Sequence, residues 1–248
     1  MYKIIYSLLL IVSLTTISCT TTKQATRLPD PPAGFIPMED NAPDKLPPIT
    51  HEKLRLDIFS REDISKLQHG TVFLGDSITE GFPIQKYFTK ELVINRGISA
   101  EGMGGFRGFG TYNRLESTVY NLHPKRIIMM IGVNDTPGMT PDNTQQKLLQ
   151  YDYLVWKIRH DLPNTELWCI SLLPTRDRHA YLLPSIRTFN IHAEEVAKKY
   201  NAHWLNVYPS FVDSNNEFIK EYTNDGLHPN TVGQDVLAKL YHEHIFKR

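Results

Sequence analysis

The sequence has few cysteines and no net charge. Only Cys19 and Cys169 occur among its 248 residues, and 27 Lys and Arg balance 27 Asp and Glu. Cys19 falls in an N-terminal export segment and Cys169 in an apolar strand-like run, so no disulfide framework is predicted. A balanced charge gives neither a basic surface for nucleic acid nor a polybasic patch for a membrane. The sequence also has no internal repeat, so repeat architectures are excluded.

The N-terminal segment has almost no charge. No charged residue lies between Lys3 and Lys23, and residues 4–14 form a nearly unbroken apolar run that ends in small and hydroxylated residues. This pattern predicts a secretory signal peptide over residues 1–18. The alternative is an uncleaved transmembrane anchor, but the apolar run is short for crossing a bilayer.

Cys19 directly follows the apolar run, in the segment Thr16-Ile17-Ser18-Cys19. The segment resembles the lipobox of bacterial lipoproteins, in which the cysteine is acylated and becomes the new N-terminus. Thr16 departs from the pattern because leucine is usual there. An ordinary cleaved signal with an incidental cysteine is the alternative. We expect an exported protein that contacts a membrane through a lipid on Cys19, and the sequence leaves open which membrane face holds it.

The remaining chain is predicted to hold a tether and one domain. Residues 19–49 are rich in Pro and Thr and lack apolar periodicity, which is typical of an extended tether. Residues 50–248 are long enough for one α/β domain with a buried core.

Short apolar runs alternate with longer amphipathic segments from about Thr50 onward, a pattern that indicates a parallel sheet covered by helices. Four of the five predicted strands are apolar at consecutive positions, which is typical of strands buried on both faces. The predicted strands are 71–75, 92–95, 126–131, 166–172 and 203–207. The predicted helices are 51–68, 113–122, 141–161, 184–200 and 230–246, the third beginning with Thr140 as N-cap and Pro141 at the first helical position.

Gly75-Asp76-Ser77 follows the first predicted strand and places a serine at a strand-to-helix turn. That position suits a nucleophile. The residues are also common in surface turns, so the motif alone is a weak signal. It differs from the G-x-S-x-G elbow because Thr79 stands where the second glycine would be.

Asp225 and His228 lie three residues apart, directly before the last predicted helix. A serine hydroxyl needs a base to take its proton, and the base needs an acceptor that fixes its tautomer. His228 and Asp225 can fill these two roles. The alternative is a capped helix start with an exposed histidine.

Two further segments lie at predicted strand ends, Asn95-Arg96-Gly97 and Gly132-Val133-Asn134-Asp135. An acyl-transfer site needs hydrogen-bond donors for the developing oxyanion, and backbone N–H groups or an asparagine amide can supply them. Each segment alone has an ordinary explanation as a loop or cap.

Taken together and in this order, the four segments resemble the SGNH hydrolase (GDSL-like) family, over residues 71–244. The resemblance implies Ser77 as nucleophile, His228 as base, Asp225 as its orienting group, and an oxyanion hole formed by Ser77, Gly97 and Asn134. It also implies a flavodoxin-like three-layer α/β/α sandwich with a five-stranded parallel sheet. No metal or organic cofactor is expected.

Within this family, residues 93–99 look most like the branch of the platelet-activating-factor acetylhydrolase subunits and bacterial carbohydrate acetylesterases. The chain departs from that branch in the glycine-rich loop 101–110, interpreted as a wall of the substrate cleft. The resemblance predicts an esterase that removes a small acyl group, with acetyl as the expected group, from a small-molecule or glycan ester. Activity on longer acyl chains, as in lipases and thioesterases, and a non-catalytic glycan-binding protein are the alternatives. The oligomeric state stays open.

Overall fold

The computed structural model describes residues 28–34, 50–104 and 110–247. The predicted signal peptide, Cys19 and most of the predicted tether lie outside these residues. Within the described ranges, no helix combines the length and apolar character needed to cross a membrane.

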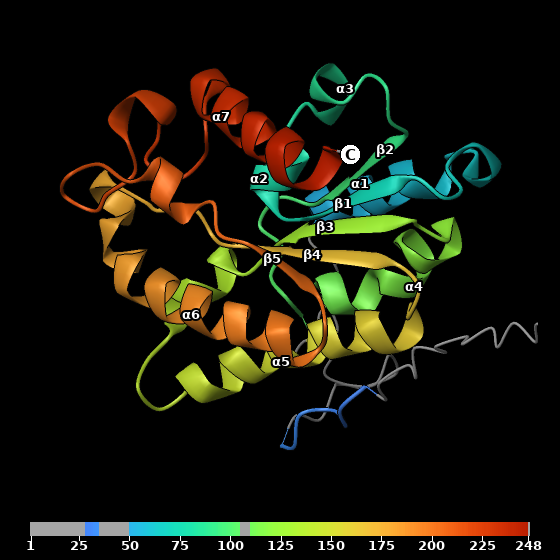
Figure 1. The fold of residues 1–248 in the computed structure, drawn as a ribbon. Helices are drawn as coiled ribbons and strands as arrows, with labels where there is room; N and C mark the ends of the chain where they lie inside the picture. Colours follow the sequence, from blue (N-terminus) through green and yellow to red (C-terminus); the bar gives the residue numbers. More distant parts are fainter. Residues whose placement is uncertain (1–27, 35–49, 105–109, 248) are drawn as a thin grey trace, which may run out of the picture.

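Five parallel strands form the centre of the domain in the order β2-β1-β3-β4-β5 (Figure 1). This is the flavodoxin-like order, and it confirms the predicted fold class. Every predicted strand is present, with ends that differ from the predictions by at most two residues. The strands are β1 (Thr71–Gly75), β2 (Val93–Gly97), β3 (Arg126–Met130), β4 (Glu166–Ile170) and β5 (His203–Leu205).

Helices cover both faces of the sheet (Figure 1). One face carries α2 (Ser77–Glu80), α3 (Ile84–Tyr87) and α7 (Thr231–Tyr241), and the other carries α4 (Leu115–Thr118), α5 (Thr144–Asp161) and α6 (Leu183–Lys199). Helix α1 (Thr50–Ser60) contacts α4. Short 3-10 helices are η1 (Ile64–Lys66), η2 (Thr111–Arg114), η3 (Tyr120–Leu122), η4 (Val133–Gly138), η5 (Asp177–Leu182), η6 (Tyr208–Phe211) and η7 (Lys220–Tyr222), and η8 (His242–Phe246) is a π-helix.

Four predicted helices differ from the observed ones, and the last of them, predicted over 230–246, divides into α7 and η8. Residues 51–68 divide into α1 and η1, and residues 113–122 divide into η2, α4 and η3. The predicted N-cap at Thr140 is wrong, because α5 begins at Thr144. Thr140 instead closes a turn: its N–H donates to Asn143 Oδ1, and its carbonyl accepts from the Thr144 hydroxyl. Such side-chain bonds to the backbone compete with helix formation.

The core lies on both sides of the central strands. All five residues of β1 and of β3 are buried, as predicted for strands covered on both faces. Gly75 at the end of β1 pairs with Gly97 of β2 and with Met130 of β3. The loops that follow these three strands therefore emerge together at one edge of the sheet, where ligands bind in folds of this type.

The described part of the predicted tether touches the domain. Trp156 on α5 donates from Nε1 to the Pro29 carbonyl at 3.1 Å, and Leu28 packs against the core. Residues 28–34 are thus held against the domain surface.

Candidate active site

Three residues from distant parts of the chain form a hydrogen-bonded row at this edge of the sheet. Ser77 Oγ lies 2.8 Å from His228 Nε2, and His228 Nδ1 lies 2.7 Å from Asp225 Oδ2. With a proton on Nδ1 directed at the carboxylate, Nε2 is free to accept the serine proton. The structure therefore brings the predicted nucleophile, base and orienting group together in the order that acyl transfer requires.

The loop that carries His228 is held by hydrogen bonds within itself. Asp225 Oδ1 accepts from the N–H groups of Leu227 and His228 at 2.9 and 2.8 Å. The Thr223 hydroxyl donates to the His228 carbonyl at 2.8 Å and accepts from the Gly226 N–H. Partial burial acts to raise the pKa of Asp225, but the bonds from His228 and Leu227 outweigh it and hold this pKa well below its usual range. The carboxylate is charged wherever it supports His228.

Asp76 fixes the turn between β1 and the helix that begins with Ser77. Its Oδ1 accepts from the Ile78 N–H at 3.0 Å and so caps α2, whose first residue is Ser77. The side chain is fully buried, and among the described residues Oδ2 has no hydrogen-bond partner. Burial raises the pKa of Asp76 to about 7, the Ile78 N–H opposes this shift, and the charges of Asp135 and Glu101 add to it.

Gly97 does not offer its N–H to the site. That group donates to Asn95 Oδ1 at 2.8 Å, so the geometry does not support the oxyanion role expected for Gly97. The residue has a packing role, because a Cβ on Gly97 would lie 2.2 Å from the Glu80 nitrogen of α2. Asn95 also donates from Nδ2 to the Thr79 carbonyl, so it fastens the end of β2 to this helix.

The backbone N–H of Ala100, unlike that of Gly97, has no hydrogen-bond acceptor among the described residues. Within the described part of the chain, the neighbouring N–H groups of Ile98, Ser99 and Glu101 are all hydrogen-bonded, whereas that of Ala100 is free. Ala100 is exposed and has a φ of 64°, a strained conformation for a residue with a side chain. Strained backbone in a loop near a candidate nucleophile points to a functional role.

The Asn134 side chain is exposed, and its amide is oriented by a neighbouring loop. Nδ2 donates one hydrogen to the Glu101 carbonyl at 2.8 Å, and the second hydrogen of this nitrogen remains available. Asn134 follows β3, which neighbours the strand before Ser77. This placement is compatible with the oxyanion role that the sequence predicts.

A second group of charged side chains connects α2 to α1. Glu80 accepts from the Ser99 N–H at 2.6 Å and from the Ser99 hydroxyl at 2.7 Å, and it pairs with His51 and Arg55 of α1. Arg55 also donates to the Gly97 carbonyl. Burial acts to raise the pKa of Glu80, but the bonds from His51 and Ser99 and the charge of Arg55 lower it below its usual range.

Arg176 lies on the loop between β4 and η5, where a solvated charge would be the ordinary expectation. Its side chain is only 15% exposed and donates to the Phe218 carbonyl at 2.6 Å, while its backbone N–H donates to the Gly226 carbonyl. Arg176 therefore supports the loop of Asp225 and His228 from behind. No sequence signal separates such an arginine from an exposed one.

With this geometry, comparison with known proteins becomes informative. Residues 73–236 match the sequence profile of the GDSL-like Lipase/Acylhydrolase family. The chain belongs to this family. This GDSL-like protein is accordingly a carboxylic ester hydrolase with a serine at its site. No curated protein is similar enough to it to be matched.

Solved structures share the fold of the GDSL-like domain. A Streptococcus pneumonia protein assigned provisionally as a platelet activating factor is 26% identical, with a TM-score of 0.65 over 78% of this chain and 92% of that chain. A GDSL-like lipase from Bacteroides thetaiotaomicron is 23% identical, with a TM-score of 0.65 over 78% and 96%. An acetylxylan esterase from Geobacillus stearothermophilus, crystallised as a catalytic mutant, is 17% identical, with a TM-score of 0.56 over 71% and 94%.

The burial of Asp76 predicts a pH dependence of stability in this GDSL-like domain. An acid whose pKa is raised on folding holds its proton in the folded state only, so stability falls as pH rises from the ordinary value toward the folded value of about 7. We expect Asp76→Asn, which keeps an oxygen for the Ile78 N–H, to flatten this fall between about pH 4 and pH 7, where Asp76 contributes up to about 1.4 kcal/mol per pH unit.

Urea unfolding of the wild type and of Asp76→Asn at a series of pH values measures this difference. Parallel curves for the two proteins over that range would show that Asp76 is ionised in the folded state, and the prediction would be wrong.

Proposed function

We propose that this esterase removes a small acyl group, acetyl in particular, from a carbohydrate ester through an acyl-serine intermediate. The observation that carries the proposal is the hydrogen-bonded row of Ser77, His228 and Asp225 at the carboxyl edge of the sheet. A protein that only bound glycans would have no need for a serine oxygen 2.8 Å from an imidazole nitrogen.

The reaction follows from this row. Ser77 Oγ attacks the acyl carbonyl carbon while His228 Nε2 takes the hydroxyl proton, and Asp225 supports the imidazolium that forms. His228 then returns the proton to the leaving alcohol oxygen as the carbon–oxygen bond breaks, which leaves the acyl group on Ser77. A water molecule repeats the sequence, with His228 as base, and releases the acid.

The negative charge on the carbonyl oxygen needs donors that are already oriented. We assign this role to the second hydrogen of Asn134 Nδ2 and to the N–H groups of Ser77 and Ala100, neither of which has a hydrogen-bond acceptor among the described residues. Ala100 takes the place given to Gly97 by the sequence, because the Gly97 N–H is bonded to Asn95.

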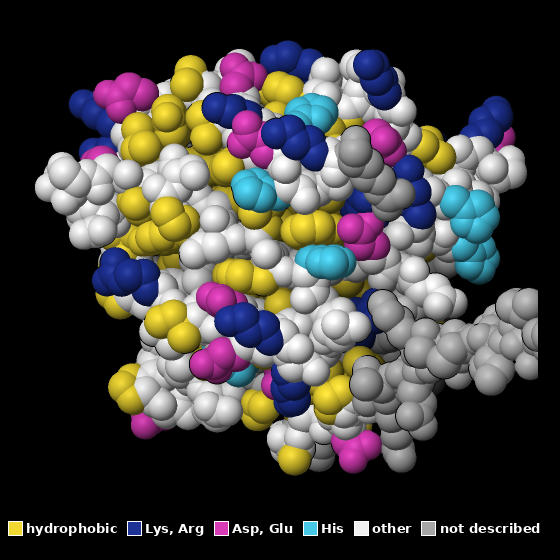
Figure 2. All heavy atoms as spheres, viewed as in Figure 1, with side chains coloured by type: hydrophobic (Ala, Val, Ile, Leu, Met, Phe, Trp, Pro, Cys, Tyr) yellow, Lys and Arg dark blue, Asp and Glu magenta, His cyan; other side chains and the backbone are white. Residues whose placement is uncertain are grey.

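Two observations support a carbohydrate acetyl ester as the substrate. Residues 93–99 resemble carbohydrate acetylesterases, and solved structures with this fold include acetylxylan esterases. On the face seen in Figure 2, basic and acidic side chains are interspersed. Longer acyl chains, as in a lipase or thioesterase, are the competing substrates.

The triad is tested by substitution. We expect Ser77→Ala and His228→Ala each to lower kcat for an aryl acetate by about 10⁴-fold or more, because the members of a triad act as a unit. For the same reason the double variant should be little worse than either single variant. Esterase kinetics measure all of these, and substantial turnover by Ser77→Ala would remove the mechanism.

The acyl group is tested separately with aryl esters of increasing chain length, beside acetylated xylan and O-acetyl sialic acid. The proposal expects kcat/KM to be highest for acetate and to decline with chain length. A maximum at long chains, lost in Ser77→Ala, would keep the serine mechanism and replace the substrate.

We further propose that the domain is exported and held to a membrane by a lipid on Cys19, on the basis of the lipobox-like segment. Cys19→Ala should then abolish labelling with a fatty acid in a bacterial host and release the domain in soluble form. Immunoprecipitation after labelling measures this, with Cys169→Ala as the matched cysteine control. Wild-type protein that takes up no label would contradict the anchor and leave the esterase proposal intact.

A further inference from the structure

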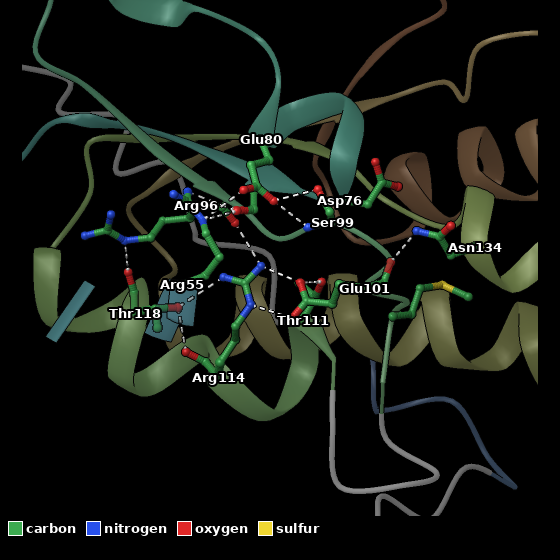
Figure 3. Close-up of polar contacts among 12 residues, drawn as sticks. Arg55, Asp76, Glu80, Arg96, Ser99, Glu101, Thr111, Arg114, Thr118 and Asn134 are labelled. Carbon is green, nitrogen blue, oxygen red and sulfur yellow. Dashed lines mark hydrogen bonds and ion pairs between the residues drawn. The ribbon is translucent and has the colours of Figure 1, made fainter. Parts of the chain in front are cut away.

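A buried ion pair lies directly behind the Asn134 amide (Figure 3). The side chains of Glu101 and Arg114 are only 2% and 4% exposed. Arg114 donates from Nε to Glu101 Oε1 at 2.7 Å and from its terminal nitrogen to Oε2, which also accepts from the Thr111 hydroxyl at 2.9 Å. The carboxylate thus receives three side-chain hydrogen bonds in a buried environment, where charge-assisted bonds are strong.

The backbone of Glu101 meets the proposed oxyanion site. Its carbonyl accepts the hydrogen bond from Asn134 Nδ2, so one residue contacts the asparagine through its main chain and the arginine through its side chain. A second bond ties the same two segments together, because the Met103 N–H donates to Asp135 Oδ2 at 3.1 Å. Figure 3 shows Glu101 between Arg114 and Asn134.

The arginine is itself fastened to the sheet. Arg114 donates to the Arg96 carbonyl at 2.8 Å, at the end of β2, and Thr118 Oγ1 accepts from Arg114 at 3.3 Å. Arg96 is 1% exposed and donates from Nε to the Thr118 carbonyl at 2.8 Å. The carbonyl that orients Asn134 is therefore connected through buried charged groups to a strand of the core.

An asparagine amide turns readily about its last side-chain torsion, since this torsion has broad preferences. A fixed acceptor on one hydrogen of Nδ2 selects the orientation in which the other hydrogen can face the substrate. Preorganised donors stabilise an oxyanion because they need no rearrangement during the reaction. A buried ion pair usually stabilises a core no more than apolar residues of similar volume would. The position of this pair behind the Asn134 amide therefore points to a role in the site.

We infer that Glu101 is a positioning residue of the oxyanion hole: its buried pair with Arg114 fixes the carbonyl that orients the Asn134 amide. This inference rests on the proposed function. Glu101 and Arg114 do not touch the substrate, and they act on the reaction through Asn134.

The test is a double-mutant cycle between Glu101→Gln and Asn134→Ala. Asn134→Ala should lower kcat for an aryl acetate by about 100- to 1000-fold with little change in KM, as the loss of an oxyanion donor does. Glu101→Gln should lower kcat by about 10- to 100-fold, because a small misplacement of a reacting group has an effect of this size. In the Asn134→Ala background, Glu101→Gln should change kcat by less than about threefold, since the amide that it positions is absent.

Glu166→Gln provides a matched control. Glu166 pairs with Arg126 at 2.7 Å, and Arg126 is 6% exposed, but both residues lie at the amino ends of their strands, opposite the site. This control should lower the thermal unfolding temperature and leave kcat nearly unchanged well below that temperature. A merely structural role for Glu101 predicts that Glu101→Gln behaves in the same way, and that result would overturn the inference.

Thr111→Val keeps the cycle informative if Glu101→Gln does not fold, because it removes one donor to the Glu101 carboxylate and preserves shape. It should lower kcat in the wild type and have a smaller effect in Asn134→Ala. An effect of equal size in both backgrounds would overturn the inference. If the wild type has no esterase activity, or if esterase activity persists in Ser77→Ala, the proposed function is overturned. These outcomes differ from those that would overturn the role of Glu101.

Discussion

The helix that begins with Ser77 packs so closely on the ends of two strands that both strands must end in glycine. A Cβ on Gly75 would lie 2.3 Å from Thr79 Oγ1 of α2, besides 2.2 Å from the Met130 carbonyl oxygen of β3, and one on Gly97 would lie 2.2 Å from the Glu80 nitrogen of α2. Neither strand end can yield, because each is paired within the central sheet. This close approach sets Ser77 at the carboxyl edge, and the other parts of the site are arranged around it.

Three acidic side chains lie close together near the start of α2. Asp76, Glu101 and Asp135 lie near enough to affect one another, and burial raises the pKa of Asp135 to about 6, an effect opposed by the Met103 N–H and by Lys147. A site that must stabilise an oxyanion is not helped by carboxylates. The bidentate contact of Arg114 with Glu101 and the raised pKa of Asp76, which favours its neutral form, both reduce their effect.

The sequence was sufficient to predict a parallel sheet covered by helices and the three residues of the hydrogen-bonded row. Buried parallel strands have apolar runs, and Ser77, Asp225 and His228 stand in short local motifs at strand and helix ends. Other features depend on contacts between distant segments. The sequence assigned an oxyanion role to Gly97, but the Gly97 N–H donates to Asn95. Ala100 adopts a left-handed conformation, which the presence of an alanine in the sequence does not predict. Likewise, nothing local distinguishes Glu101 or Arg176 from an exposed charged residue, and the bonds around Thr140 that delay α5 are equally unmarked in the sequence.

The His228–Asp225 side of the site is more exposed than the side that carries the proposed oxyanion donors, and this difference matches the chemistry proposed for each side. The side chains of His228 and Asp225 are 42% and 40% exposed, on a loop held mainly by bonds within itself. A base that first faces the serine and then the leaving oxygen needs small adjustments, which such a loop allows. The oxyanion side is backed by Glu101 and Arg114, which are nearly inaccessible to solvent. Stabilisation of a developing charge depends on donors that do not move, so the chain places its buried charged groups behind the donors and leaves the base on the more exposed loop.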